Sequence, residues 1–312
     1  MKLAFVFPGQ GSQSVGMMSG YADLDAVRDT FSEASELLGE DLWSLAANGP
    51  AEALNLTTNT QPLMLVAGIA VFRSWIGLGG RFPEAVAGHS LGEYSALVAA
   101  DSMKFPEAVP LVRIRAQYMQ EAVPAGTGAM AAVLGLDDAG VLAACEEAST
   151  DKEIAEAANF NAPGQVVVAG QKAAVERAVE AAKSRGAKRA MLLPMSAPSH
   201  CSLMKPASER LAAELRKVSI EMPRVPVIHN ESVSAANDTD ALRDALVRQI
   251  CRPVRWAQTI TSLVESGVTH IVECGPGKVL AGLNRRIGVD VQTIALTDTN
   301  SLNSAVAALK GG

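Results

Sequence analysis

Short apolar runs alternate with longer segments of helical periodicity along most of the chain. The apolar runs are typical of buried strands and lie at 3–7, 85–87, 226–229, 269–273 and 291–296. The helical patterns lie at 24–38, 61–75, 94–100, 106–123, 203–217, 239–250 and 256–266, and a short helix is expected after the last strand. Strands that alternate with helices on this scale predict a parallel, doubly wound sheet.

A different pattern occupies the middle of the chain. Its strands are expected at 129–134, 154–160, 165–169 and 188–193, and its helices at 137–149 and 171–185. The resulting order, βαββαβ, is that of a ferredoxin-like unit. We therefore expect a small domain over 125–195, inserted into a large α/β domain made of 1–124 and 196–312.

One strand leads directly into the motif Gly88-His89-Ser90-Leu91-Gly92-Glu93, and a helical segment follows it. A Gly-x-Ser-x-Gly sequence between a strand and a helix is typical of a nucleophile elbow. Because the two flanks come close together in such a turn, a Cβ at Gly88 or Gly92 would clash. Ser90 is expected to adopt a strained backbone conformation. The alternative is a tight turn that carries an ordinary serine.

The helix predicted over 106–123 carries a positive charge on its apolar side. Arg115 falls near the middle of the apolar arc. Its helical neighbours offer no carboxylate, since they are Leu111, Val112, Tyr118 and Met119. A guanidinium in apolar surroundings is costly unless an anion meets it. Either another segment supplies an acid in a structural ion pair, or the anion is a substrate.

A serine nucleophile needs a base within hydrogen-bond distance, and the chain has four histidines. His89 precedes Ser90 on the incoming strand, so its side chain should point the other way. His270 lies within an apolar strand and has the pattern of a core residue. His229 ends a strand and His200 lies in a loop, and the residues alone leave these two candidates open.

Composition narrows the class of protein. A formal net charge of −6 over 312 residues provides no basic excess for binding nucleic acid. The four cysteines are far apart, which favours reduced thiols over disulfides or a zinc site. The apolar run at 3–7 is too short for a signal peptide, and the longest run, 63–72, is about half a membrane span. We expect a cytoplasmic protein without a membrane segment or a metal site.

The glycine-rich loop at 8–13 follows the first strand. It contains neither of the two common phosphate-binding motifs. Such a loop can instead direct a backbone N–H toward a reaction centre, as in enzymes with an elbow serine. A plain turn is an equally good interpretation of its composition.

Several of these motifs together resemble malonyl-CoA:acyl carrier protein transacylases of the freestanding bacterial type. In chain order they are 8–13 (Pro-Gly-Gln-Gly-Ser-Gln), 88–93, Arg115, 161–165 (Asn-Ala-Pro-Gly-Gln), 198–200 (Pro-Ser-His) and 275–277 (Gly-Pro-Gly). The resemblance implies an α/β-hydrolase-like large domain with a ferredoxin-like insert. It also implies transfer of a malonyl group from coenzyme A to the phosphopantetheine thiol of acyl carrier protein, by a ping-pong route that supplies fatty-acid synthesis without a cofactor.

The resemblance also assigns roles to individual residues. It makes Ser90 the nucleophile and favours His200 as its base. It places Gln249 near this histidine, which in the family leans on a main-chain carbonyl rather than on an aspartate. The backbone N–H groups of Gln10 and Leu91 are the implied oxyanion hole.

For the substrate, the resemblance assigns Arg115 to the malonyl carboxylate. Asn161 and Gln165 are expected to help shape the cleft. The sequence Ala-Pro-Ser-His at 197–200 departs from the His-Ala-Phe-His of many malonate-selecting modular polyketide acyltransferases. This difference favours the freestanding fatty-acid enzyme.

Three other functions share parts of this pattern. A serine hydrolase with the same elbow would release free malonate. The acyltransferase subunit of a malonate decarboxylase would share the catalytic residues and differ in its carrier protein. A non-catalytic protein that docks a carrier would leave the set of catalytic residues unexplained. The sequence does not determine the oligomeric state or the surface on which a carrier docks.

Overall fold

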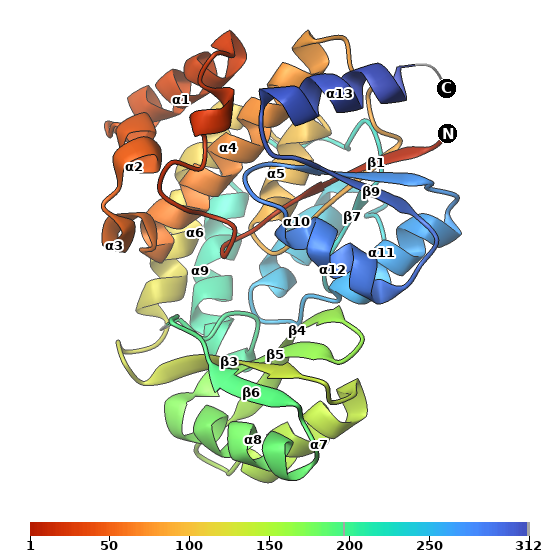
Figure 1. The fold of residues 1–312 in the computed structure, drawn as a ribbon. Coiled ribbons are helices and arrows are strands. Elements are labelled where there is room, and N and C mark those ends of the chain that lie inside the picture. Colours follow the sequence, from red (N-terminus) through yellow and green to blue (C-terminus); the bar gives the residue numbers. More distant parts are fainter. Residues whose placement is uncertain (196, 311–312) are drawn as a thin grey trace.

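The computed structural model describes residues 1–195 and 197–310. The chain forms two parts, each built around its own β-sheet (Figure 1). The larger part contains a five-stranded sheet, and the smaller part contains a four-stranded one. The predicted domain boundary at residue 196 and the last two residues, 311–312, lie outside the described residues.

The larger sheet is parallel and has the strand order β7-β2-β1-β8-β9. Its strands are β1 (Leu3–Phe7), β2 (Ala85–Gly88), β7 (Val227–Ile228), β8 (His270–Cys274) and β9 (Gln292–Leu296). Every residue of the central strand β1 is buried. Because both faces of this sheet are covered, its central strand is apolar throughout instead of alternating with polar residues.

Side chains of β1 point alternately into two apolar clusters, one on each face of the sheet. One face is covered by α11 (Trp256–Glu265) and α12 (Val279–Ile287). The cluster on the other face draws on α1 (Asp25–Leu38), α2 (Leu42–Asn48), α3 (Ala51–Leu54), α4 (Thr57–Gly77), α5 (Gly92–Ala99), α6 (Phe105–Glu121), α9 (Lys205–Leu215), α10 (Thr239–Gln249) and α13 (Thr299–Leu309). Among the described residues, no helix combines the length and the apolar character that crossing a membrane requires.

The smaller sheet is antiparallel and has the strand order β4-β5-β3-β6. Its elements are β3 (Gly128–Leu134), α7 (Asp138–Ala148), β4 (Ala155–Ala162), β5 (Gln165–Gln171), α8 (Lys172–Ser184) and β6 (Arg189–Leu192). The two helices cover one face and enclose a separate apolar core. The order of these elements along the chain is the one that the sequence predicts.

Main-chain hydrogen bonds join the two parts. The Phe160 N–H of β4 donates to the Val254 carbonyl over 2.8 Å, and the Val254 N–H donates to the Ala158 carbonyl over 2.9 Å. Arg286 of α12 adds a 2.6 Å bond from its guanidinium to Gln165 Oε1. Strand β4 is therefore tied to the segment just before α11, which sets the position of the smaller sheet.

Three helices have no counterpart among the predicted elements: α2, α3 and α12. The first two are short, with seven and four residues. Helix α12 follows Gly275-Pro276-Gly277, a pattern that predicts a loop. A side chain of the preceding strand, β8, supports its first turn, because the buried Glu273 accepts hydrogen bonds from the N–H groups of Leu280 and Ala281 at 3.0 and 2.7 Å. This cap depends on how the end of β8 packs against α12, which a periodicity pattern does not show.

Candidate active site

The turn between β2 and α5 has the geometry expected of a nucleophile elbow. Ser90 adopts a φ of 54°, in the left-handed region that non-glycine residues seldom occupy. A Cβ on Gly88 would lie 1.9 Å from the carbonyl carbon of Gly92, and a Cβ on Gly92 would lie 2.0 Å from the Phe7 carbonyl oxygen. Both glycines are therefore required by the close approach of β1, β2 and α5.

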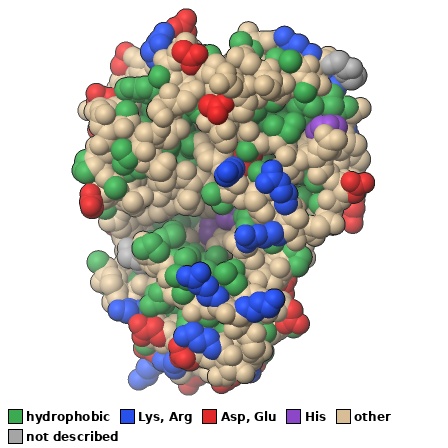
Figure 2. Space-filling model, viewed as in Figure 1, with side chains coloured by type: hydrophobic (Ala, Val, Ile, Leu, Met, Phe, Trp, Pro, Cys, Tyr) green, Lys and Arg blue, Asp and Glu red, His purple; other side chains and the backbone are tan. Residues whose placement is uncertain are grey.

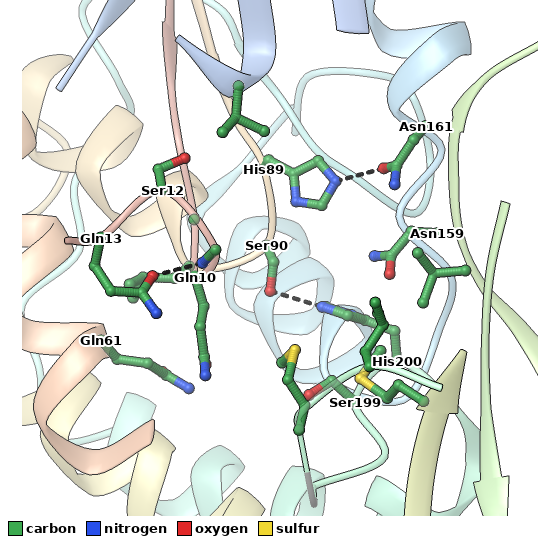
Figure 3. Close-up of a pocket in the computed structure, with 18 of the residues that line it drawn as sticks. Gln10, Ser12, Gln13, Gln61, His89, Ser90, Asn159, Asn161, Ser199 and His200 are labelled. Carbon is green, nitrogen blue, oxygen red and sulfur yellow. Dashed lines mark hydrogen bonds between the residues drawn. The ribbon is translucent and has the colours of Figure 1, made fainter. Parts of the chain in front are cut away.

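His200 lies next to the serine. Its Nε2 is 2.6 Å from Ser90 Oγ (Figure 3). Its Nδ1 is 2.8 Å from the main-chain carbonyl oxygen of Gln249. Because a carbonyl only accepts, Nδ1 carries the proton and Nε2 accepts from the serine hydroxyl. His200 itself has a φ of 62°, so this ring is also presented from a strained backbone position.

The other histidines have different partners. His229 Nδ1 lies 2.6 Å from Glu93 Oε1, and both side chains are buried. His89 Nε2 lies 2.8 Å from Asn161 Oδ1. His270, at the start of β8, lies next to a threonine hydroxyl. Of the four histidines, which are all described, His200 alone forms a hydrogen bond with Ser90.

The surroundings of His200 favour its neutral form. Burial, together with the nearby positive charge of Arg115, lowers the pKa of His200 from 6.5 to about 3. The ring is thus uncharged at neutral pH and has a free lone pair on Nε2. In this state it can accept the proton of the serine as the hydroxyl attacks.

Arg115 of α6 is fully buried. One terminal nitrogen donates to Gln61 Oε1 over 2.6 Å, and the other donates to Gln249 Oε1 over 2.9 Å and approaches Ser90 Oγ at 3.4 Å. Its Nε has no hydrogen-bond partner. Within the described part of the chain no carboxylate pairs with this guanidinium, so a structural ion pair is absent there.

Two backbone N–H groups near the serine are unpaired. Neither the Gln10 N–H nor the Leu91 N–H donates to another described residue, and both residues line the same cleft as Ser90. The loop that carries Gln10 packs directly on the elbow, because a Cβ on Gly9 would lie 2.4 Å from the His89 carbonyl oxygen. Two free donors beside a nucleophile can stabilise a developing oxyanion.

The cleft lies between the two parts of the molecule and has a volume of about 440 Å³. Figure 2 shows a hollow there, with a histidine visible in it and Lys and Arg side chains around it. The smaller part contributes Met130, Asn161 and Gln165 to the wall, and α12 contributes Val279 and Leu283. Among the described residues, no group of three or more His, Cys, Asp and Glu side chains is arranged to hold a metal ion.

Sequence reasoning missed Asn230. Its Oδ1 accepts from the Ser90 N–H over 2.7 Å, and its Nδ2 donates to the Gly88 carbonyl over 2.6 Å, so it holds both sides of the elbow. Its position just beyond β7 was a usable signal, because parallel sheets gather functional residues at the carboxyl ends of their strands. Gln61 was missed as well, although a buried amide within an apolar helix is an equally clear signal.

Comparison with known proteins agrees with this arrangement. A family model described as an acyl transferase domain matches residues 4–296. The malonyl CoA-acyl carrier protein transacylase of Escherichia coli K12 is 53% identical over 310 residues, which cover 99% of each chain. The crystal structure of acyl-carrier-protein S-malonyltransferase from Burkholderia pseudomallei 1710b is 55% identical with a TM-score of 0.96, and covers 98% of this chain and 100% of that one.

The chain belongs to the malonyl-CoA:acyl carrier protein transacylase family. The resemblance inferred from the motifs is thereby confirmed. A further solved structure of this family is described as a type II polyketide synthase acyl-carrier protein in complex with its malonyl-transacylase. Its matching chain is 48% identical with a TM-score of 0.97, and the match covers 99% of this chain and 100% of that one.

The two candidate bases can be separated by mutation. We expect His200→Ala to slow the reaction of Ser90 with a fluorophosphonate by about 10²–10⁴-fold, because a positioned base contributes that much. His229→Ala should leave the rate within about tenfold, since its ring contacts Glu93 and not the serine. Intact-mass kinetics measure both rates. The reverse ranking would contradict the assignment of the base.

The pKa of His200 predicts an unusual pH profile. Because His200 stays neutral down to about pH 3, the rate of Ser90 modification should not fall as the pH drops through 6.5. The unfolded chain does protonate this ring below 6.5, so the free energy of unfolding should decrease there, and the melting temperature must be followed in parallel. A rate that titrates near pH 6.5 in folded protein would contradict the lowered pKa.

Proposed function

We propose that this protein transfers a malonyl group from malonyl-CoA to the phosphopantetheine thiol of acyl carrier protein, with Ser90 as the nucleophile. The observation that carries the proposal is the buried guanidinium of Arg115. It lies 3.4 Å from the serine hydroxyl and has amide oxygens, not carboxylates, as partners. A substrate carboxylate would supply the missing negative charge beside the nucleophile.

In the first half-reaction, the malonyl carboxylate pairs with Arg115 and directs the thioester carbonyl toward Ser90. His200 Nε2 takes the hydroxyl proton as Oγ attacks the carbonyl carbon. The N–H groups of Gln10 and Leu91 hold the developing oxyanion, and one such donor typically lowers the barrier by about 3 kcal/mol. The C–S bond then breaks, and coenzyme A leaves with the proton from His200.

In the second half-reaction, the thiol of the carrier's phosphopantetheine takes the place of coenzyme A. His200 accepts the thiol proton, and the sulfur attacks the malonyl ester on Ser90. The ester bond breaks, and His200 returns the proton to the serine oxygen. This ping-pong route is balanced without a cofactor or metal ion, because coenzyme A and the carrier act as substrates.

Two amides complete the proposed site. The main-chain carbonyl of Gln249 accepts from Nδ1 of His200 and so keeps this nitrogen protonated. The side-chain amide of Gln249 accepts from Arg115. Asn161 accepts from His89 and thereby brings a residue of the smaller part to the edge of the elbow. We assign both residues to substrate binding. Gln249 acts by holding Arg115 in place, and Asn161 acts by shaping the wall of the cleft.

We also propose a fold type for each of the two parts of the molecule. We interpret 1–124 and 196–312 as an α/β-hydrolase-like domain, and 125–195 as a ferredoxin-like one. The strand order β4-β5-β3-β6, with both helices on one face, supports the second description. The four cysteines are free thiols, which suits the cytoplasmic location that we propose.

The alternative functions, a serine hydrolase, a malonate decarboxylase subunit and a non-catalytic docking protein, are not favoured. Full-length relatives from Escherichia coli and Bacillus subtilis, 53% and 44% identical, are named malonyl CoA-acyl carrier protein transacylases. Neither a hydrolase nor a malonate decarboxylase subunit is among these names. The malonyl-carrier product would supply fatty-acid or polyketide synthesis.

A covalent intermediate tests the proposed chemistry. Incubation with malonyl-CoA should add one malonyl group to Ser90, and later addition of the phosphopantetheinylated carrier should remove it onto the carrier thiol. Ser90→Ala should form no adduct, because among the described residues Ser90 is the one whose hydroxyl forms a hydrogen bond with His200 Nε2. Intact-mass analysis and peptide mapping follow both steps. An adduct on another serine, or release as free malonate despite the carrier, would contradict the proposal.

The role of Arg115 predicts a change in specificity. Arg115→Ala should lower kcat/KM for malonyl-CoA by about 10²–10³-fold, because the malonyl carboxylate is left buried and unpaired. Acetyl-CoA has no carboxylate and should react at least as well as with the unaltered protein. Arg115→Lys should restore malonyl transfer only in part, since an ammonium cannot form the planar two-bond pair.

The ratio of the two kcat/KM values is the deciding quantity, with the melting temperature measured alongside it. An unchanged malonyl-to-acetyl ratio in Arg115→Ala would show that the guanidinium does not bind the substrate carboxylate.

A further inference from the structure

A second buried charge lies behind the nucleophile. Glu93, in the first turn of α5, is fully buried and accepts three hydrogen bonds from three different residues. Its Oε1 lies 2.6 Å from His229 Nδ1. Its Oε2 accepts from the Asn230 N–H at 3.0 Å and from Gln249 Nε2 at 3.1 Å. The proposed mechanism uses neither Glu93 nor His229.

Glu93 is one of three groups that determine which way the Gln249 amide faces. The Nε2 of Gln249 donates to two acceptors, the Ser90 carbonyl at 2.8 Å and Glu93 Oε2, while its Oε1 accepts from Arg115. The reversed orientation would place the amide oxygen against two other oxygens and the NH₂ group against a guanidinium. An amide has distinct donor and acceptor ends, so only the observed direction pairs all three contacts.

Arg115 depends on this direction. Its two terminal nitrogens donate to the amide oxygens of Gln61 and Gln249, and its central carbon lies 5.5 Å from the centre of the Tyr94 ring. Losing the Gln249 oxygen would leave the Gln61 oxygen as the one amide acceptor of the guanidinium among the described residues. Leaving a buried donor without an acceptor costs free energy, and this cost would favour a different position of the guanidinium.

We propose that Glu93 is a positioning residue for malonyl selectivity. Together with the Ser90 carbonyl, its carboxylate holds the Gln249 amide in the observed direction. The amide in turn holds the guanidinium of Arg115 at the place where the substrate carboxylate binds. This inference rests on the proposed function, since it assigns a task to a residue behind the same site. Glu93 acts through hydrogen-bond direction and touches no substrate atom.

The two oxygens of the carboxylate allow this role to be separated from general stability. His229 contacts Oε1, and its own Nε2 is buried and has no hydrogen-bond partner among residues 1–195 and 197–310. Gln249 is held by Oε2. His229→Ala therefore disturbs the same buried carboxylate from the side that does not lead to Arg115, which makes it a matched control.

The test is the ratio of kcat/KM for Ser90 acylation by malonyl-CoA to that by acetyl-CoA. In Glu93→Met, which keeps the length of the side chain and lacks an oxygen acceptor, the ratio should fall about tenfold or more. Glu93→Gln should keep the ratio within about threefold, because its amide oxygen can take the place of Oε2. His229→Ala should lower the melting temperature and leave the ratio unchanged.

If Glu93→Met does not fold, Glu93→Asp provides the same readout. It keeps the charge, but the shorter side chain draws the carboxylate away from Gln249, so the ratio should again fall. An unchanged ratio in whichever of these two variants folds would overturn the proposal. So would an equal loss of selectivity in Glu93→Gln or in His229→Ala, since the effect would then come from charge or from general destabilisation.

Failure of the proposed function would look different. The unaltered protein would then show no preference for malonyl-CoA, or Arg115→Ala would leave the ratio as it was. With that preference established, the Glu93 variants test only how Arg115 is held.

Discussion

Ser90 lies at a point where three backbone segments meet without room for side chains between them. The end of β1, the end of β2 and the start of α5 approach so closely that a Cβ on Gly88 or Gly92 would lie about 2 Å from neighbouring main-chain atoms. This contact gives Ser90 its positive φ and presents its hydroxyl to the cleft. It also brings the loop after β1 against the elbow, so that the N–H of Gln10 and that of Leu91 line one cavity.

Near this turn, the buried side chains of Arg115 and Glu93 are connected through the Gln249 amide and not by a direct contact. Arg115 and Glu93 are both fully buried, and Gln249 stands between them, donating to one and accepting from the other. Burial is costly for each charge unless hydrogen bonds compensate it. A direct pair would neutralise the guanidinium, whereas an amide provides a hydrogen-bond acceptor and leaves the positive charge in place. The same charge contributes to the lowered pKa of His200, so these two buried groups are electrostatically coupled.

The active-site side chains come from both halves of the molecule, and the connection between the halves determines how they meet. Ser90 and Asn230 follow strands of the parallel sheet, at the end where such sheets form their sites. Asn161 comes from the antiparallel sheet, which is tied to the larger part by main-chain bonds at Val254. Because these bonds fix β4, the cleft between the parts has a defined width and a mixed wall.

The sequence by itself determined the local features of the site, which depend on residues that are close together in the chain. The strand, turn and helix around Ser90 follow from local sterics. A period of 3.6 residues places Arg115 on the buried face of its helix, with no acid among its neighbours three and four residues away. Local patterns missed α12, whose first turn is capped by Glu273 from another element. They also left two histidines open as bases. Only the tertiary structure placed His200, and not His229, beside Ser90 and revealed Glu93 as a shared acceptor. The reason is that distances between residues far apart in the chain depend on how the elements pack.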